Sequence, residues 1–419
     1  MMSLERIVLS VMIFCSTNVF RGNAQVNDSG PPKPPVGKRW ILNPAFSDEF
    51  NGTVLDTTKW LDHHPTWIGR PPGLFMPSQV SVADGSLQLK GQKMNNDTIV
   101  HAYGKDITFN IKGAAVVSKR PVFLGYYECR VKAAATTMST TFWFSGNGGV
   151  GPNGCDSYGQ EWDIQECIGR EGDFEGKYFA SGMHSNAHYW YTDCDEGKHD
   201  YRAAQVRFED TELASKDFHV YGGWWRDEKS ASYYYDDREP KHQKFYDKIT
   251  DKPMDKPMYM RLVHETYPFP WISLPTDEEL ADDTKNTVYY DWVRGYELVG
   301  LNASNESKLE QDLGLYDETI IFESAEINLR NSKTLNIPLS YKANTDRQIE
   351  LVLFDLEGKK IQESIFVAFA GYANLEFNFK LDKELKPMAG YKLVASMRPM
   401  EGDQKSSIDA NTVFVNLVK

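Results

Sequence analysis

The sequence has no excess of positive charge. Its 46 Lys and Arg residues are outnumbered by 59 Asp and Glu residues, which gives a formal net charge of −13. Nucleic acids and anionic membranes attract basic surfaces, so this composition argues against both as general partners. We therefore expect no nucleic-acid partner.

Cysteine is also scarce. The five cysteines include no C-x-x-C pair and no Cys/His cluster with zinc spacing, so they give metal catalysis no support. Cys15 lies in an apolar N-terminal run that we interpret below as a signal segment. Four cysteines therefore remain for the folded protein. An exported protein can form one disulfide from these, and Cys155–Cys194 is the first pair to test. Free buried thiols are the alternative.

Long apolar runs are missing, apart from one at the N-terminus. Arg6 precedes an apolar stretch from Ile7 to Phe20, and small residues follow as far as Ala24. This pattern is typical of a secretory signal over residues 1–24, and it is too short to span a bilayer. We expect a secreted, periplasmic or cell-surface protein without a membrane span. Lipid attachment at Cys15 is an alternative that the surrounding residues disfavour.

Convincing amphipathic helices are scarce as well, which favours an all-β fold. A Pro-rich linker over 25–39 leads into short alternating runs over 40–300, which we interpret as a β-jelly-roll sandwich. A polar, acidic segment over 301–318 is interpreted as a second linker. Residues 319–419 form a smaller all-β unit whose strand spacing fits an Ig-like sandwich, an accessory domain in which no motif carries chemistry. We expect the whole chain to be a monomer.

Acidic residues, in contrast, gather in one apolar stretch, "GQEWDIQECIG" (Gly159 to Gly169). Strand side chains alternate between faces, so Glu161 and Asp163 share a face and Glu166 is out of phase. A β-bulge between Ile164 and Cys167 would bring Glu166 to the same face. Strands disfavour neighbouring like charges, so we interpret the cluster as functional.

Two glutamates that converge from one strand can flank a glycosidic oxygen. Retaining glycosidases use one carboxylate as nucleophile and a second carboxyl group as proton donor, and their pKa values must differ. Asp163 between them can help to distribute the protons of the site. The residues alone leave open which glutamate takes which role. The 10 Trp, 22 Tyr and 22 Phe residues of the chain are compatible with a sugar-binding cleft as well as with an aromatic core.

"EWDIQE" resembles the E-x-D-x-x-E motif of glycoside hydrolase family 16 in its bulged form. "FSDEFNGTVLDTTKW" (Phe46 to Trp60) and "YYDWVRGYEL" (Tyr289 to Leu298) are similar to the first and last strands of that family. "WIGRPPGLFMPSQVSVADGSLQL" (Trp67 to Leu89) is similar to its agarase and porphyranase branch. The resemblance implies a jelly-roll with an open cleft and a retaining endo-mechanism. It implies that Glu161 is the nucleophile, Glu166 the acid/base and Asp163 the assisting acid.

The same resemblance suggests residues that bind the substrate. It implies that Trp67 is a stacking platform on the non-reducing side and that Trp143 and Glu265 face the cleft. Arg70 either binds a sugar hydroxyl or sulfate, or clamps its own loop. His184 lies on a strand expected beside the acids, where it either contacts the site or is a core histidine.

Many members of the family hold a structural calcium ion. By resemblance its ligands here are Glu49, the Gly85 carbonyl and Asp291, which offer the oxygen atoms that calcium prefers. We expect no cofactor for catalysis.

A red-algal galactan is the expected substrate and partner, with agarose first and sulfated porphyran as the alternative. The loop Gly146 to Gln160 contains no Arg or Lys, which favours a neutral substrate. A non-catalytic lectin on the same scaffold is a remote alternative. It would be expected to lack one of the two catalytic glutamates, and both are present.

Overall fold

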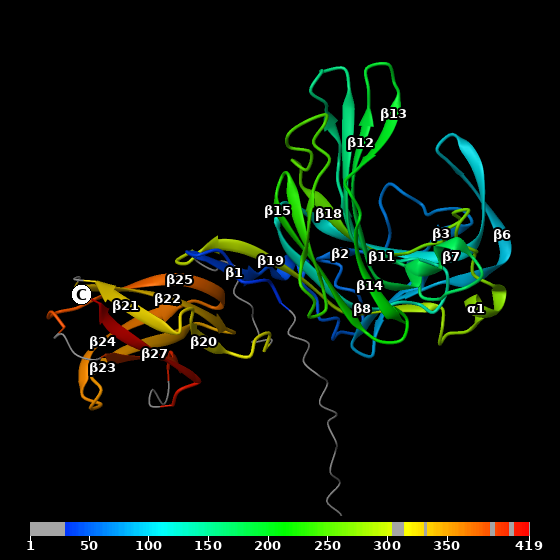
Figure 1. The fold of residues 1–419 in the computed structure, drawn as a ribbon. Helices are drawn as coiled ribbons and strands as arrows, with labels where there is room; N and C mark the ends of the chain where they lie inside the picture. The colour runs from blue at the N-terminus through cyan, green and yellow to red at the C-terminus, as the bar shows by residue number, and fades with distance from the viewer. Residues whose placement is uncertain (1–29, 304–313, 331–332, 386–389, 402–405, 419) are drawn as a thin grey trace, which may run out of the picture.

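A computed structural model describes residues 30–303, 314–330, 333–385, 390–401 and 406–418. The expected signal segment lies outside these residues, as does most of the expected second linker. The chain forms two β units, as the sequence predicts (Figure 1). The first unit contains the short helices η1 (Pro44–Phe46), η2 (Pro77–Gln79), η3 (Glu175–Ala180) and α1 (Asp277–Ala281). No helix of the described chain has the length and apolar character needed to cross a membrane.

Two large, mostly antiparallel sheets form the first unit. The inner sheet has the order β13 (Lys198–Arg202), β12 (Ser181–Thr192), β11 (Ser157–Cys167), β9 (Thr140–Ser145), β18 (Met258–His264), β7 (Lys105–Val122) and β2 (Trp60–Leu61). Further strands attach to it: β10 (Gly149–Val150) on β11, β14 (Val206–Leu213) on β12, and β3 (Gly73–Phe75) and β6 (Gln92–Ala102) on β7.

The outer sheet has the order β17 (Lys241–Lys244), β16 (Ser230–Tyr235), β15 (His219–Asp227), β8 (Gly125–Lys132), β19 (Thr287–Gly300) and β1 (Lys38–Leu42), and continues into β25 (Gly371–Lys380), β22 (Thr334–Ala343) and β20 (Thr319–Phe322). In addition, β5 (Ser86–Lys90) pairs with β19, and β4 (Val80–Ala83) pairs with β5.

The core of the first unit fills the space between the two sheets. Phe142 and Phe144 of β9 are fully buried there, together with Trp162 and Ile164 of β11. Side chains alternate along each strand, so the residues between them point away from this core. Trp143 therefore lies on the opposite face of β9, as the alternation of its neighbours predicts.

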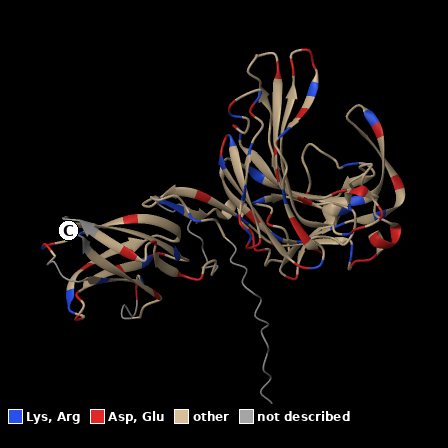
Figure 2. Cartoon of the chain, viewed as in Figure 1, with Lys and Arg blue, Asp and Glu red and all other residues tan. Residues whose placement is uncertain are grey.

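The second unit is a smaller sandwich with its own core. Its separate sheet has the order β21 (Glu326–Arg330), β27 (Asp409–Val418), β26 (Tyr391–Pro399), β23 (Arg347–Phe354) and β24 (Lys360–Ala368). The apolar side chains of this sheet pack with those of β20, β22 and β25 in one buried cluster. Acidic and basic side chains are interspersed over both units, and acids gather on α1 (Figure 2).

Strand β1 joins the two units. It pairs with β19 of the first unit along one edge and with β25 of the second along the other. This corrects the expected boundary of the Pro-rich linker, because Lys38 and Arg39 are strand residues and Arg39 is fully buried. Its guanidinium donates a hydrogen bond to the Ala303 carbonyl, at 2.8 Å. A Pro/Gly/Lys composition did not reveal that the chain would become the middle strand of a shared sheet.

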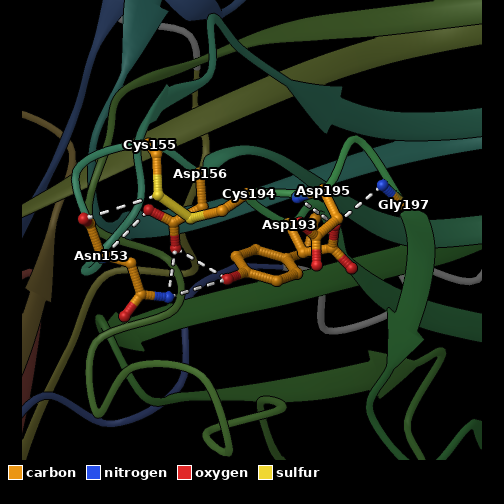
Figure 3. Close-up of a disulfide and its surroundings, with 8 residues drawn as sticks. Asn153, Cys155, Asp156, Asp193, Cys194, Asp195 and Gly197 are labelled. Atoms are coloured by element: carbon orange, nitrogen blue, oxygen red, sulfur yellow. Dashed lines mark hydrogen bonds between the residues drawn. A yellow bond between two sulfur atoms is a disulfide. The ribbon is translucent and has the colours of Figure 1, made fainter.

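The predicted disulfide is confirmed. Cys155 and Cys194 are bonded across 39 residues of sequence (Figure 3). Cys194 lies in the turn between β12 and β13, and Cys155 lies in the loop between β10 and β11. Cys129 and Cys167 are free and buried.

Candidate active site

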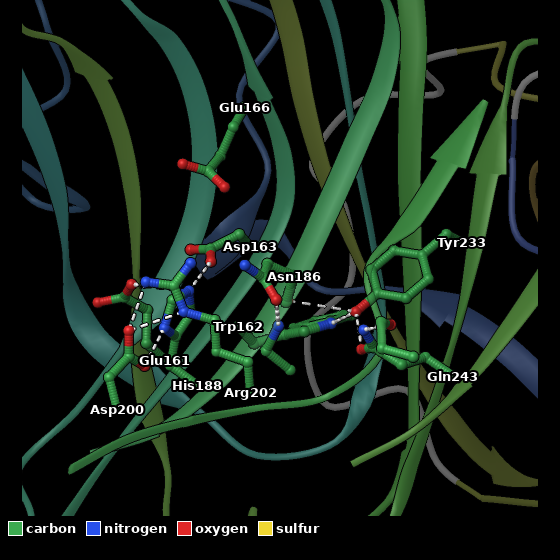
Figure 4. Close-up of polar contacts among 12 residues, drawn as sticks. Glu161, Trp162, Asp163, Glu166, Asn186, His188, Asp200, Arg202, Tyr233 and Gln243 are labelled. Atoms are coloured by element: carbon green, nitrogen blue, oxygen red, sulfur yellow. Dashed lines mark hydrogen bonds and ion pairs between the residues drawn. The ribbon is translucent and has the colours of Figure 1, made fainter. Parts of the chain in front are cut away.

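Strand β11 carries the predicted β-bulge. Against β9, Asp163 pairs with Trp143 but Gln165 pairs with Phe142, so Ile164 is an extra residue at this point. After this register shift, the side chains that follow point to the opposite face of the sheet from the one that regular alternation would give them. Glu166 therefore lies on the same face as Glu161 and Asp163 (Figure 4). Trp162 points the other way, into the core.

The three acids open into a cavity of about 840 Å³ on the inner sheet. Five residues were expected to bind the substrate. Four of them lie on the walls of this cavity, and His184 does not. The residues around the acids that matter for the argument below are Trp67, Arg70, Trp143, Trp190, Arg261, Glu265 and Tyr267. They come from three strands and two loops, which the jelly-roll brings together from distant parts of the sequence.

His188 binds the acid cluster from the neighbouring strand. Its Nε2 lies 3.4 Å from Asp163 and 3.9 Å from Glu161, and its Nδ1 lies 2.7 Å from Asp200 (Figure 4). Both ring nitrogens face carboxylates, which only accept hydrogen bonds, so the ring is an imidazolium. Burial lowers the His188 pKa, but the hydrogen bond and charge of Asp163 outweigh burial and raise it to about 9.

A metal ion does not fit this cluster. Ligand atoms of Glu161, Asp163 and His188 lie within 4.8 Å of one another, which is close enough to hold an ion. An imidazolium has no free lone pair for coordination, however. The cluster is therefore an acid–imidazolium network.

The surroundings of the two glutamates differ in charge. Burial raises the pKa of both. Around Glu161, burial and the charge of Asp163 raise the pKa to about 7, although His188, the indole N–H of Trp190 and Arg261 stabilise the carboxylate. Around Glu166 the charges of Glu161 and Glu265 add to burial, and the Glu166 pKa rises to about 7. The pKa of each glutamate is about 7, so one shared proton near neutral pH is compatible with the expected roles of Glu161 as nucleophile and Glu166 as acid/base.

Aromatic and cationic side chains form one wall of the cavity. The rings of Trp67 and Trp143 lie 6.2 Å apart, nearly perpendicular. Arg261 lies over Trp143 at 4.9 Å and donates a hydrogen bond to His64, at 2.9 Å. Its other hydrogen bonds go to the carbonyls of Ser145 and Tyr259. Burial lowers the Arg261 pKa to about 10, so the guanidinium stays charged at neutral pH.

Arg70 forms an ion pair with Glu265, with its Nε 2.8 Å from the carboxylate. The guanidinium also lies 5.6 Å from the Trp67 ring and 5.1 Å from the Phe269 ring. Glu265 is buried, whereas Arg70 is more than a third exposed toward the cavity. Both expectations for Arg70 are thus compatible with the structure, because it clamps the loop and still offers donors to a ligand.

Comparison with known proteins agrees with this site. A family model described as "Beta-porphyranase A-D, GH16 domain" matches residues 40–298, which is more than half of the chain. This chain belongs to glycoside hydrolase family 16. A second model, "Porphyranase-associated domain", matches residues 320–410 of the family 16 enzyme.

Three individual proteins illustrate the relationship. Beta-porphyranase D of Zobellia galactanivorans is 68% identical over 393 residues, which cover 93% of this chain and 92% of that protein. The crystal structure of a beta-porphyranase from the human gut bacterium Bacteroides plebeius is 36% identical with a TM-score of 0.59, covering 65% of this chain and 96% of that one. An extracellular agarase of Streptomyces coelicolor is 28% identical over 292 residues, which cover 64% of this chain and 87% of the agarase. The family 16 enzyme is an endo-glycoside hydrolase of a galactan, which rules out the alternative of a non-catalytic lectin.

His184 is not part of the site of this family 16 enzyme. It is fully buried, it stacks on Phe179 at 4.4 Å, and its Nε2 lies 3.0 Å from the Ser181 carbonyl. Burial lowers its pKa to about 4, so it is a neutral core histidine. The histidine that contacts the acids is His188, four residues further along the same strand.

The expected calcium ligands are engaged elsewhere. Both carboxylate oxygens of Glu49 pair with Arg294, at 2.8 and 2.9 Å, and Asp291 pairs with Arg130. Carboxylates held by guanidinium groups do not fit a calcium ligand set, so we derive no role for a cation. The Gly85 carbonyl lies in the turn between β4 and β5. Calcium at this position stays an untested prediction.

Sequence reasoning missed His188, Trp190, Arg261 and Tyr267. A charged residue within the apolar run "YMRLVH" was a signal for Arg261, by the same logic that singled out the acids. Nothing comparable marked Tyr267, because a tyrosine after a strand is ordinary in an aromatic-rich chain.

Tyr267 contacts Glu166, the residue expected to be the acid/base. Its hydroxyl donates a hydrogen bond to Glu166 at 2.9 Å, which stabilises the carboxylate and lowers the Glu166 pKa. In Tyr267→Phe that pKa should rise, so Glu166 keeps its proton to higher pH. We expect the alkaline limb of kcat/KM to move up by about one pH unit, the scale of one hydrogen bond to a charged group.

Measuring kcat/KM against pH for both enzymes tests this prediction. Tyr127→Phe is the matched control, because the Tyr127 hydroxyl bonds the Leu124 carbonyl in the core, and its profile should not move. An alkaline limb that stays in place or moves down in Tyr267→Phe would contradict the assignment.

Proposed function

We propose that the protein is an exported β-porphyranase that cuts β-1,4 bonds inside porphyran chains with retention of anomeric configuration. The observation that carries this proposal is the 68% identity, over nearly the full length of both chains, with a protein named beta-porphyranase D. Agarases match more distantly and over a smaller part of the chain, at 28% identity over 64% of the chain for the Streptomyces coelicolor enzyme. We therefore place porphyran before agarose, which reverses the order of substrates expected from the sequence. Export follows from the N-terminal signal pattern.

The charges of the site support a two-step reaction. Glu161, ionised beside His188, attacks the anomeric carbon while Glu166 donates its proton to the leaving oxygen, and the glycosidic bond breaks. Glu166 then takes a proton from water, which attacks the same carbon and releases Glu161. Asp163 and His188 hold the Glu161 carboxylate in place between the two steps.

A cation in the cavity without a bonded carboxylate supports a sulfated substrate. Arg261 lines the cavity, and its hydrogen bonds go to His64 and to backbone carbonyls, so its charge is not matched by a bonded carboxylate of the described residues. The charge of Glu161 acts on Arg261 without a bond between them, so a sulfate group can form the direct ion pair that the guanidinium lacks. The loop over residues 146–160 favoured a neutral substrate because it lacks basic residues, but the cation of the cavity comes from β18 instead.

Degradation of the two galactans tests the proposal. We expect the purified protein to release reducing ends from porphyran at least about 10-fold faster than from agarose, since one well-placed charged hydrogen bond is worth about that factor. In Arg261→Met the rate on porphyran should fall about 10- to 100-fold, and the rate on the same polymer desulfated by solvolysis, which leaves the galactose rings intact, should fall much less.

Two outcomes would decide against the proposal. Faster hydrolysis of agarose than of porphyran by the parent enzyme would restore the original order of substrates. An equal loss on sulfated and desulfated polymer in Arg261→Met would show that Arg261 supports the site without meeting a sulfate. Circular dichroism of the variant checks that it is folded.

A further inference from the structure

Trp190 is an exposed aromatic side chain beside the acids. It lies on β12 and lines the cavity, and 42% of its surface is exposed. Its sequence neighbours Tyr189 and Tyr191 are buried on the other face of β12, where their rings stack 6.2 Å apart. Trp190 pairs with Gly159 of β11, which places no side chain beside the indole. An exposed tryptophan inside a cleft needs a reason, because the fold gains nothing from its exposure.

The indole ring is held in one orientation. It stacks on the His188 ring, with centroids 5.0 Å apart and planes 11° from parallel. His188 is itself fixed by Asp200 and Asp163. One face of Trp190 is thus covered by a rigid neighbour, while the side chain as a whole remains open to the cavity. A flat apolar face held in this way is suited to stack on a sugar ring at low cost in conformational entropy.

The hairpin that carries Trp190 is fixed at its far end. Cys194 in its turn is bonded to Cys155 of the β10–β11 loop (Figure 3). Next to the disulfide, the Tyr191 hydroxyl donates a hydrogen bond to Asp156 at 2.7 Å, and Asn153 donates another to the same carboxylate at 3.1 Å. These contacts keep the hairpin from swinging away from the cleft.

Trp190 lies on the opposite side of the acids from the other two tryptophans. In the inner sheet β12 follows β11 on one side, and β9, which carries Trp143, follows it on the other. Trp67 contacts Trp143, so both belong to that second side. The glutamates therefore lie between two aromatic surfaces.

We propose that Trp190 is the sugar-stacking platform on the leaving-group side of the scissile bond, where it binds the galactose-series ring that departs with the Glu166 proton. The assignment of sides rests on the proposed function, in which Trp67 holds the non-reducing part of the chain. Trp190 then acts on the bond-breaking step by binding the part of the substrate that leaves, and it determines how well the enzyme uses substrates that extend past the cleavage point.

Two kinds of substrate separate this role from an indirect one. The first is a porphyran oligosaccharide that extends past the scissile bond on both sides. The second is an aryl glycoside of the donor-side oligosaccharide, in which a nitrophenyl group replaces the leaving sugar. In Trp190→Leu we expect kcat/KM to fall about 30-fold on the first substrate, which is the scale of one buried aromatic anchor, and to stay within about threefold on the second.

Two further variants serve as controls. Trp190→Phe keeps a flat ring but loses the N–H that stabilises Glu161, so it should lose the same factor, about threefold or less, on both substrates. Trp67→Leu removes the platform of the opposite side, and it should lower kcat/KM on both substrates. The melting temperature of each variant reports whether it is folded.

Equal losses on both substrates in Trp190→Leu, of the size seen in Trp190→Phe, would mean that Trp190 only stabilises the Glu161 carboxylate, and the proposal would be overturned. Unchanged kcat/KM of Trp190→Leu on the long substrate would overturn it as well. Running the same variants on agarose oligosaccharides keeps this question apart from the choice of polymer. A parent enzyme that cleaves agarose alone removes the porphyran proposal, and the platform is then tested on the agarose series.

Discussion

Glu161→Ala lowers the turnover of the galactan by about 10⁴-fold or more, because the variant has no group that can form the glycosyl-enzyme intermediate. The Glu161 side chain is half-buried on the cavity side of β11, and three neighbours stabilise its charge. No other carboxylate of the cluster can replace it, since Asp163 is held by His188. Initial rates of reducing-end release measure the loss.

Azide makes the result specific to the nucleophile. The small anion can occupy the space left by the Glu161 carboxylate and attack the anomeric carbon once, which gives a glycosyl azide of inverted configuration. Proton magnetic resonance of the product distinguishes the two anomers. Hydrolysis by Glu161→Ala at the parent rate, or an azide product of retained configuration, would remove Glu161 from the nucleophile's role.

Glu166→Gln is expected to lower kcat on the polysaccharide by about 10²- to 10⁴-fold, which is the range of one general acid–base catalyst. Glutamine matches the size of Glu166 and can still accept the Tyr267 hydrogen bond, but it has no proton to donate to the leaving oxygen. A nitrophenyl leaving group needs no such proton, so the first step on an aryl glycoside should lose far less.

The pH profile supplies the second criterion for Glu166. The parent loses activity above neutral pH as Glu166 gives up its proton, because its folded-state pKa is about 7. In Glu166→Gln this alkaline limb should disappear from kcat/KM on the aryl glycoside. A variant that keeps the limb would assign it to another group. Titration with a galactan oligosaccharide should show that both glutamate variants still bind substrate.

Much of this site could be predicted because alternation within one strand is a local property. The facing of Trp143 against Phe142 and Phe144 followed from neighbours in sequence, and so did the need for a bulge before Glu166. Pairing across strands was harder to predict. His184 and His188 lie on the same strand, and a register shift between Ser181 and Met183 precedes both.

Ion pairs between residues far apart in the sequence could not be predicted either. Glu49 and Asp291 matched a calcium pattern, but Arg294 and Arg130 bind them in the fold. Lys38 and Arg39 had the composition of a linker, yet two sheet edges from distant parts of the chain enclose them. In each case the deciding partner is far away in sequence.

The sequence by itself determined the β architecture and the acid cluster with its break in alternation. These follow from the period of two along a strand and from the cost of placing like charges on one face. Only the tertiary structure decided which histidine, arginine and tryptophan surround the acids, and that one strand fuses the two units. The physical reason is that register between strands is set by packing and turn geometry over the whole sandwich, and no short stretch of sequence contains that information.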